Sequence, residues 1–218
     1  MSRGLHLDVY LLAFDTRSQS LQDRARAGFL VRAGALAELA HRGAAAEDAA
    51  GRVRVVSAAA TADPVLDTLL AELGSRPHTW RSWIRRNREE TLEAVEERLA
   101  VLGVVTMADR DPYGPVVPRR PVAMADPREA LDLQVRVAGL VRGGAPAAAV
   151  PFADAVLAAL AAHGHLRLVL SRHDRRAHAG RIAELTDRIA DRSPGLARAV
   201  GGLNLTMVAA QGGMGGGG

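Results

Sequence analysis

The chain contains neither cysteine nor lysine, and each absence narrows what it can do. Without cysteine, disulfide bonds and thiolate metal sites are excluded. Without lysine, all 28 basic residues are arginine. Together with the abundant alanine and glycine, this indicates the codon bias of a GC-rich bacterial genome.

A long apolar run is also missing. No segment approaches the ~20 consecutive apolar residues that span a bilayer. Near the N-terminus, Asp8 falls where a signal peptide needs an apolar region. We therefore expect a cytoplasmic protein whose contact with any membrane is peripheral.

The length of 218 residues fits one domain with a sizeable core. We expect this domain to span residues 1–205 and the glycine-rich residues 206–218 to form a disordered tail. The formal net charge is only +4, so the field of the whole molecule is a weak argument for binding a polyanion.

Apolar spacing predicts that most of the chain is helical. Phe29, Ala33, Leu36 and Ala40 recur at helical spacing, and Gly43 is placed to end that helix, which we predict over residues 29–42. Either Thr61 or Asp63 caps the next helix, and residues 5–14 form either a strand or the first turns of a helix. Further helices are expected at residues 64–73, 79–87, 89–102, 126–141, 153–162 and 173–191.

Short extended segments separate the helices. Residues 52–57 alternate as a strand, residues 15–27 are a polar loop, and a turn at 111–115 joins strands at 104–107 and 116–117. The predicted fold class is mainly α, a single globular helical domain with surface β-hairpins. A helix ending at glycine before an extended segment occurs three times, a pattern that winged-helix domains also show.

Arginine is concentrated in two stretches. Residues 76–88 hold five arginines and no acid, and residues 167–181 hold five arginines and one acid, Asp174. In the first stretch the helical spacing places most of the arginines on one stripe, formed by Arg81, Arg85 and Arg88, with Arg86 beside it.

Two interpretations of this stripe stay open. Flanked by Trp80, with Trp83 and Ile84 turned inward, it could lie on anionic lipid headgroups. It could equally be a solvated helix face whose arginines pair with nearby acids, namely Glu89, Glu90 and Glu93.

No motif predicts catalysis, a cofactor or a metal. The sequence has no nucleophile elbow, phosphate-binding glycine loop or zinc-protease motif. Four histidines lie close together in the sequence, but their spacing does not place two on one helical face beside carboxylates; they are His163, His165, His173 and His178. We expect a protein that is not an enzyme.

Four segments in a fixed order carry a resemblance to a known family. They are 36–43 (LAELAHRG), 62–70 (ADPVLDTLL), Trp83-Ile84 and 97–105 (ERLAVLGVV). At these separations the chain resembles the Golgi phosphoprotein 3 family, whose eukaryotic members bind phosphatidylinositol 4-phosphate. The resemblance implies a mostly helical globule with surface β-hairpins and no catalytic activity.

The resemblance also implies four lipid-binding positions: a tryptophan, an arginine nine residues later, and two basic residues three apart on a later helix. In this chain the arginine is present as Arg32. The other three positions hold Asp23, Glu93 and Glu96, and we expect Arg32 to form an ion pair near these acids. The sequence therefore predicts no specific binding of phosphatidylinositol 4-phosphate.

A surface hairpin that inserts into the bilayer is a further implication of the resemblance. Its counterpart lies at 112–120 and carries one aromatic, two valines and two arginines, namely Tyr113, Val116, Val117, Arg119 and Arg120. Such a hairpin suits either a membrane interface or self-association.

The predicted function is peripheral binding to anionic phospholipid or a role as an adaptor for other proteins, without a cofactor. One alternative is a protein–protein interaction or oligomeric scaffold module that binds no lipid. A winged-helix-like nucleic-acid binder is a weaker alternative, because the helix at 89–102 is acidic and phosphate would repel it.

Overall fold

The chain opens with a helix, α1 (Leu5–Ala13), which settles the choice that the sequence left between strand and helix. The computed structural model describes residues 3–108 and 121–212. After α1, the strands β1 (Phe14–Asp15) and β2 (Ser20–Leu21) pair as an antiparallel hairpin. Helix α2 (Arg24–His41) follows.

Helix α2 begins five residues before the predicted start. The loop expected at 15–27 is wrong at both ends, because Asp15 belongs to β1 and residues 24–27 belong to α2. The carboxylate of Asp23 accepts a hydrogen bond from the Arg26 backbone N–H and caps the helix. The predicted start was placed at Phe29, the first apolar residue at helical spacing, but the capping residue Asp23 lies six residues earlier. The rest of the expected loop is the β1–β2 hairpin.

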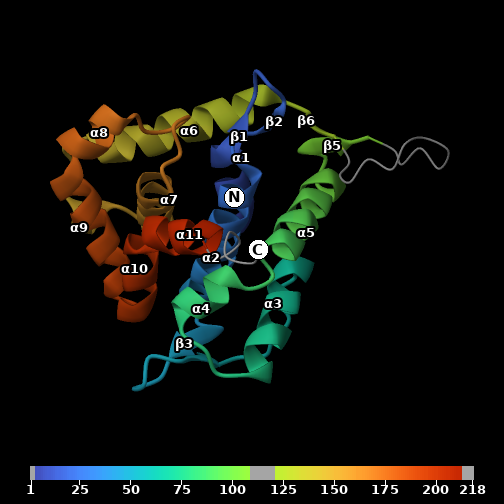
Figure 1. The fold of residues 1–218 in the computed structure, drawn as a ribbon, viewed down its shortest axis with the longest axis vertical. Helices are drawn as coiled ribbons and strands as arrows, with labels where there is room; N and C mark the ends of the chain where they lie inside the picture. Colours follow the sequence, from blue (N-terminus) through green and yellow to red (C-terminus); the bar gives the residue numbers. More distant parts are fainter. Residues whose placement is uncertain (1–2, 109–120, 213–218) are drawn as a thin grey trace.

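The centre of the molecule is made of helices that are buried on nearly every side (Figure 1). Helix α2 packs against α1 and against α7 (Phe152–His163), and α1 and α7 also contact each other. A helix that is apolar all round belongs in a core, because any face turned to water would expose apolar surface. The central position expected for residues 153–162 is confirmed.

One side of the core is covered by residues 45–101, which occupy the right and the lower centre of Figure 1. The strands β3 (Ala45–Glu47) and β4 (Val53–Val55) pair antiparallel, and β3 was not predicted. The helices α3 (Pro64–Ser75), α4 (Trp80–Arg85) and α5 (Arg88–Val101) follow, close to their predicted bounds. Gly43 and Gly103 have φ of 70° and 71° after α2 and α5, which is the left-handed conformation expected where a helix ends at glycine.

A third hairpin connects this side to the next helix. The strands β5 (Val105–Met107) and β6 (Val122–Met124) pair antiparallel, and the Met124 N–H donates to the Gln19 side chain of the first hairpin at 2.9 Å. The turn and strand predicted at 111–117 lie outside the described residues. Helix α6 (Pro127–Arg142) and the short 3₁₀ helix η1 (Ala147–Ala149) precede α7.

The opposite side is covered by α8 (Arg172–Ala177), α9 (Ala179–Ala190) and α10 (Pro194–Gly201). The single helix predicted over 173–191 is therefore two helices, which meet at His178 (φ −112°, ψ 28°). Neither α10 nor the last helix, α11 (Leu203–Gly212), was predicted, and the boundary expected between residues 205 and 206 falls inside α11. The predicted fold class, mainly α with surface hairpins, is confirmed.

Candidate anion-binding surface

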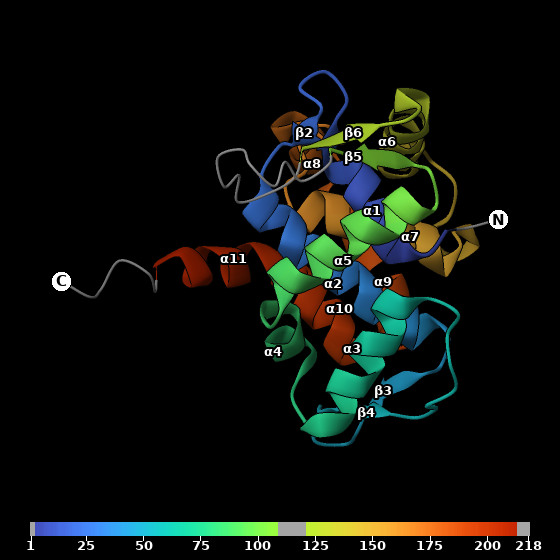
Figure 2. The ribbon, with the colours of Figure 1, turned by 90° about the vertical axis from the view of Figure 1, so that its right-hand side faces the viewer.

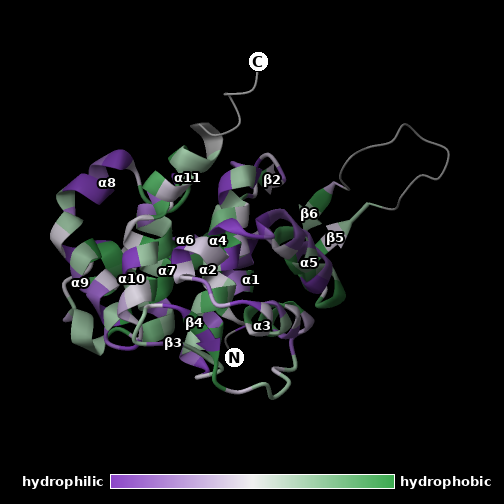
Figure 3. Cartoon of the chain, turned by 60° about the horizontal axis from the view of Figure 1, so that its bottom comes forward, coloured by the Kyte–Doolittle hydropathy of each residue, from purple (hydrophilic) through white to green (hydrophobic). Residues whose placement is uncertain are grey.

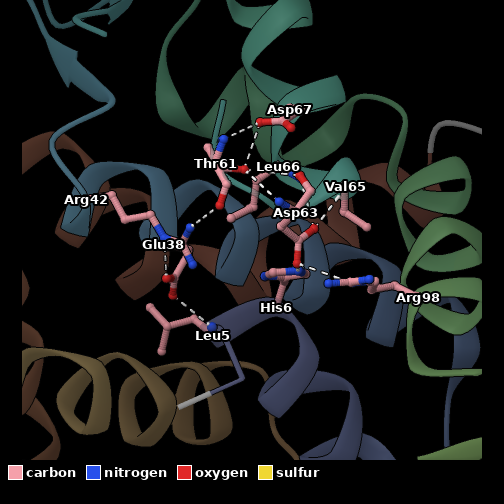
Figure 4. A network of polar contacts seen from close by, with 10 residues as sticks. All are labelled: Leu5, His6, Glu38, Arg42, Thr61, Asp63, Val65, Leu66, Asp67 and Arg98. Atoms are coloured by element: carbon pink, nitrogen blue, oxygen red, sulfur yellow. Dashed lines mark hydrogen bonds and ion pairs between the residues drawn. The ribbon is translucent and has the colours of Figure 1, made fainter. Parts of the chain in front are cut away.

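Three of the four segments that carry the family resemblance meet in one polar network (Figure 4). Glu38 of α2 accepts a hydrogen bond from the Leu5 backbone N–H at 2.9 Å and another from Arg42 at 2.7 Å. Asp63, at the start of α3, lies 3.3 Å from the His6 imidazole and 3.8 Å from the Arg98 guanidinium of α5. These motif residues therefore join α1, α2, α3 and α5, and they serve the fold.

Asp63 carries the charge at the centre of this network. Burial raises its pKa, but the His6 imidazole 3.3 Å away and the backbone N–H groups of Val65 and Leu66 outweigh burial and hold the pKa below its ordinary value. Asp63 also caps α3, so the choice between Thr61 and Asp63 falls to Asp63.

The structure places Arg32 in the core with 1% of its surface exposed. Its guanidinium donates to the Trp83 carbonyl at 3.2 Å, to the Thr91 hydroxyl at 2.8 Å and to the Glu72 carboxylate at 2.5 Å. The expected ion pair with Glu93 or Glu96 is therefore wrong, because Glu72 is the acid beside it. The Arg32 side chain thus links the end of α4 to the start of α5, and it helps to position the exposed residues between these two helices.

Glu96 has a different basic partner, Arg24. The Arg24 guanidinium donates to both Glu96 carboxylate oxygens, at 2.5 and 2.8 Å, and the Tyr10 hydroxyl donates to the same carboxylate at 3.2 Å. Burial, followed by the charge of Glu96, raises the pKa of Tyr10 far above its ordinary value. Around Glu96, therefore, the polar groups already satisfy one another.

The first arginine-rich stretch forms an exposed cluster where α4 gives way to α5. Arg85, Arg86 and Arg88, here called the basic junction, line a surface hollow of about 420 Å³ together with Ser82 and Ala210. The backbone between the two helices turns at Asn87 (φ 43°). The arginines therefore do not form the single helical stripe that their spacing predicted, yet the turn still brings them together.

Few acids neutralise the basic junction. Within the described ranges, Arg85 and Arg86 form no ion pair, and Arg88 lies 3.8 Å from Glu89. Two aromatic rings lie next to these arginines. The Arg86 guanidinium lies 5.9 Å from the centre of the Trp83 ring, and the Arg88 guanidinium lies 4.7 Å from the centre of the Phe29 ring. Arg86 and Arg88 of the basic junction thus make cation–π contacts with buried aromatic rings.

The two tryptophans of α4 lie inside the molecule. Trp83 and Ile84 are buried, as predicted. Trp80 was expected to flank the arginines at a membrane, and this is wrong: it is 1% exposed, and its indole N–H donates to Glu47 at 3.1 Å. Neither tryptophan of α4 marks a membrane interface, because both side chains are buried in the core.

Helix α11 adds apolar surface beside the basic junction. Figure 2 shows it extending away from the body next to α4, and Figure 3 shows it mostly pale green, in contrast to the purple α8. Leu203 and Met207 pack inward, whereas Leu205 and Val208 are 71% and 58% exposed. Arg81 of the predicted stripe donates to the Thr206 hydroxyl at 3.1 Å and ties α11 to α4.

The sequence analysis missed α11, although a signal was present. The run 203–210 has leucine, methionine and valine at helical spacing, but glycine pairs precede and follow it. The predicted hairpin residues Tyr113, Val116, Val117, Arg119 and Arg120 lie outside the described residues. Among the residues that the structure does describe, no group of three histidine, aspartate or glutamate side chains could hold a metal ion.

The described part of the chain is thus a helical protein with small hairpins and an exposed basic junction, and no helix in it is long and apolar enough to cross a bilayer. A model of the Golgi phosphoprotein 3 (GPP34) family matches residues 5–202. The chain therefore belongs to this family, as the four ordered segments predicted. No curated protein matches the chain.

Proposed function

We propose that this member of the family is a non-enzymatic protein that binds anionic membrane surfaces peripherally. The contact surface consists of the basic junction and the exposed side of α11. The observation that carries the proposal is a group of three arginines beside two exposed apolar side chains. Arg85 and Arg86 are exposed and form no ion pair in the described structure, and Arg88 is half-buried.

Electrostatic attraction supplies the first part of the binding. A basic residue close to an anionic surface contributes about 1 kcal/mol. Three arginines therefore contribute about 3 kcal/mol, which is on the order of a hundredfold in affinity. Because Arg85 and Arg86 have no ion pair to break among the described residues, little of this attraction is spent on separating existing partners.

Apolar contact supplies the second part. Leu205 and Val208 are three residues apart on α11 and share one face of the helix. An exposed leucine or valine gains roughly 1.5–3 kcal/mol when fully buried, and partial insertion at the headgroup boundary gains a fraction of that. Arg81 holds α11 against α4, so both parts can meet one flat surface. Residues 112–120 remain a second proposed contact.

The test is flotation with vesicles of phosphatidylcholine alone and with phosphatidylglycerol added. We expect the full chain to bind only the anionic vesicles. The triple variant Arg85→Gln, Arg86→Gln, Arg88→Gln should bind them about a hundredfold more weakly, with an unchanged helical signal by circular dichroism.

A matched control removes the same charge elsewhere. Arg54 and Arg136 are exposed and Arg188 is half-buried, and the three lie in ion pairs with Asp48, Asp154 and Asp191. Their triple glutamine variant should bind anionic vesicles within about threefold of the unaltered chain. Equal loss in both triple variants would mean that net charge, and not the basic junction, controls binding.

A further inference from the structure

The second arginine-rich stretch folds against the start of α2 and encloses a separate basic hollow. The hollow has a volume of about 260 Å³. Its polar lining comes from three elements: the start of α2, the end of α7 and helix α8. The lining residues that matter here are Asp23, Arg26, His165, Arg167 and Arg175.

Positive charge in this hollow exceeds negative charge. The one carboxylate, Asp23, already accepts hydrogen bonds from the backbone and the side chain of Arg26. Arg167 and Arg175 form no ion pair within the described ranges, and the nearby Asp174 is held by Arg142 at 2.9 Å. Two uncompensated guanidinium groups thus face a partly enclosed space.

Burial and the crowding of positive charge lower the pKa of two groups that line the hollow. Burial, followed by the charges of Arg167, Arg172 and Arg26, lowers the pKa of Arg175. Burial and then the charges of Arg175, Arg26 and Arg167 likewise lower the pKa of His165. A bound anion would relieve this repulsion, because it places negative charge among the like charges.

The arginines are held in place by the backbone. Arg26 donates to the Gly164 carbonyl at 3.0 Å, and Arg175 donates to the Leu170 carbonyl at 2.7 Å. Arg26 is fixed through Nε and Nη1 and Arg175 through Nη1, so each guanidinium keeps other N–H groups for a ligand. Groups that are ordered before binding lose little entropy when a ligand arrives.

His165 occupies a position that favours glycine. It follows α7 with φ of 53°, and its N–H and that of Leu166 donate to Ala162 and Ala161, which close the end of the helix. The preceding residue, Gly164, is a glycine for a different reason: a Cβ added there would lie 2.4 Å from the Leu30 side chain. The imidazole therefore sits at the hollow in a backbone conformation that is costly for histidine.

We propose that this basic hollow binds the phosphate group of a phosphate monoester. Such a group carries nearly two negative charges at neutral pH, which match the two uncompensated arginines. Its oxygens accept paired hydrogen bonds from guanidinium groups. The volume is below the roughly 300–1,000 Å³ of sites for drug-sized ligands, which suits a small anionic group. The monoester belongs either to a soluble compound or to a lipid headgroup.

The first arm of the test uses soluble probes. Calorimetry with inorganic phosphate and with glycerol 3-phosphate should show saturable binding to the full chain. The double variant Arg167→Gln, Arg175→Gln should weaken it at least about tenfold. The control Arg128→Gln, Arg176→Gln removes the same charge from exposed positions that do not line the hollow, and it should leave binding within about threefold.

The second arm identifies the source of the phosphate. If only a lipid headgroup binds, soluble probes show nothing, but vesicles with phosphatidic acid, a monoester, bind better than phosphatidylglycerol vesicles of equal total charge. That preference should vanish in the Arg167→Gln, Arg175→Gln variant and survive in the basic-junction triple variant. Because the two surfaces share no residue, this result is independent of the function proposed above.

A last variant separates binding from folding. His165→Gly relieves the strained backbone, so it should raise the melting temperature while weakening phosphate binding several-fold. The proposal is overturned if no monoester binds in either arm, or if the Arg128→Gln, Arg176→Gln control loses as much binding as the lining variant.

Discussion

At the scale of single residues, the buried charges are the costly features of this protein. Arg32, Glu38, Asp63 and Glu96 are all buried, and each has an oppositely charged or hydrogen-bonding partner. A buried charge that loses its partner is strongly destabilising, whereas the pair itself contributes little net stability. Their value therefore lies in fixing how the helices meet.

Asp63 provides a direct test of this role. Asn caps a helix about as well as Asp, so Asp63→Asn keeps the α3 cap but removes the charge that faces His6 and Arg98. We expect a loss of about 1–3 kcal/mol in the free energy of unfolding at neutral pH, measured by urea denaturation. The matched control is Asp126→Asn, an exposed cap on α6 with no buried ion pair, which should lose less than about 0.5 kcal/mol.

The same variant has a defined pH dependence. The pKa of Asp63 is lowered in the folded protein, so its stabilising contribution is complete above the unfolded value of about 3.9 and is lost as pH falls through the folded pKa. The difference in stability between the unaltered chain and Asp63→Asn should therefore shrink below about pH 4. A difference that stays constant through this range would contradict the assignment of the charge to Asp63.

At the scale of elements, α11 differs from the helices that build the core. The central helices are buried on nearly every side, but α11 packs through Leu203, Thr206 and Met207, with Ala210 partly buried, and exposes Leu205 and Val208. Exposed apolar pairs occur elsewhere too: Leu131 and Val135 of α6 are 46% and 73% exposed. What sets α11 apart is the basic junction beside it.

This difference can be tested by two matched double variants. Leu205→Ser, Val208→Ser should reduce binding to anionic vesicles at least about fivefold, because it removes the apolar part of the contact. Leu131→Ser, Val135→Ser changes a similar apolar area on α6 and should leave vesicle binding unchanged. Both should melt within a few degrees of the unaltered chain. If the two variants bound anionic vesicles equally well, α11 would not be part of the contact surface.

At the scale of the whole molecule, the location of charge matters more than its sum. The formal net charge is +4, yet the basic junction and the basic hollow are two separate concentrations of arginine. Most other arginines of the described residues lie in ion pairs, which contribute little field at a distance.

A salt titration follows from this distribution. Charges at a surface act over about 8 Å at physiological ionic strength, so binding to phosphatidylglycerol vesicles should fade between low salt and about 0.3 M salt. Flotation across that range, with the basic-junction triple variant in parallel, provides the measurement. Binding that does not respond to salt would place the interaction on an apolar surface and contradict the arginine assignment.

The sequence alone determined the helical class, most helix ends and the family. Those properties depend on local patterns: the period of the apolar residues, glycine at the ends of α2 and α5, and caps such as Asp63. Two helix ends were not predicted from the apolar period. Helix α2 begins earlier, at the Asp23 cap, and the helix expected over 173–191 is interrupted at His178.

Only the tertiary structure decided which polar residues are buried and which line a hollow. Arg32 matches a lipid-binding position of the family, but its burial and its pairing with Glu72 depend on how α2, α3 and α4 pack. Arg26 and Arg175 are 149 positions apart, and they line one hollow only because the start of α2 lies beside α8. Burial and proximity of this kind arise from contacts between distant segments, which no local pattern encodes.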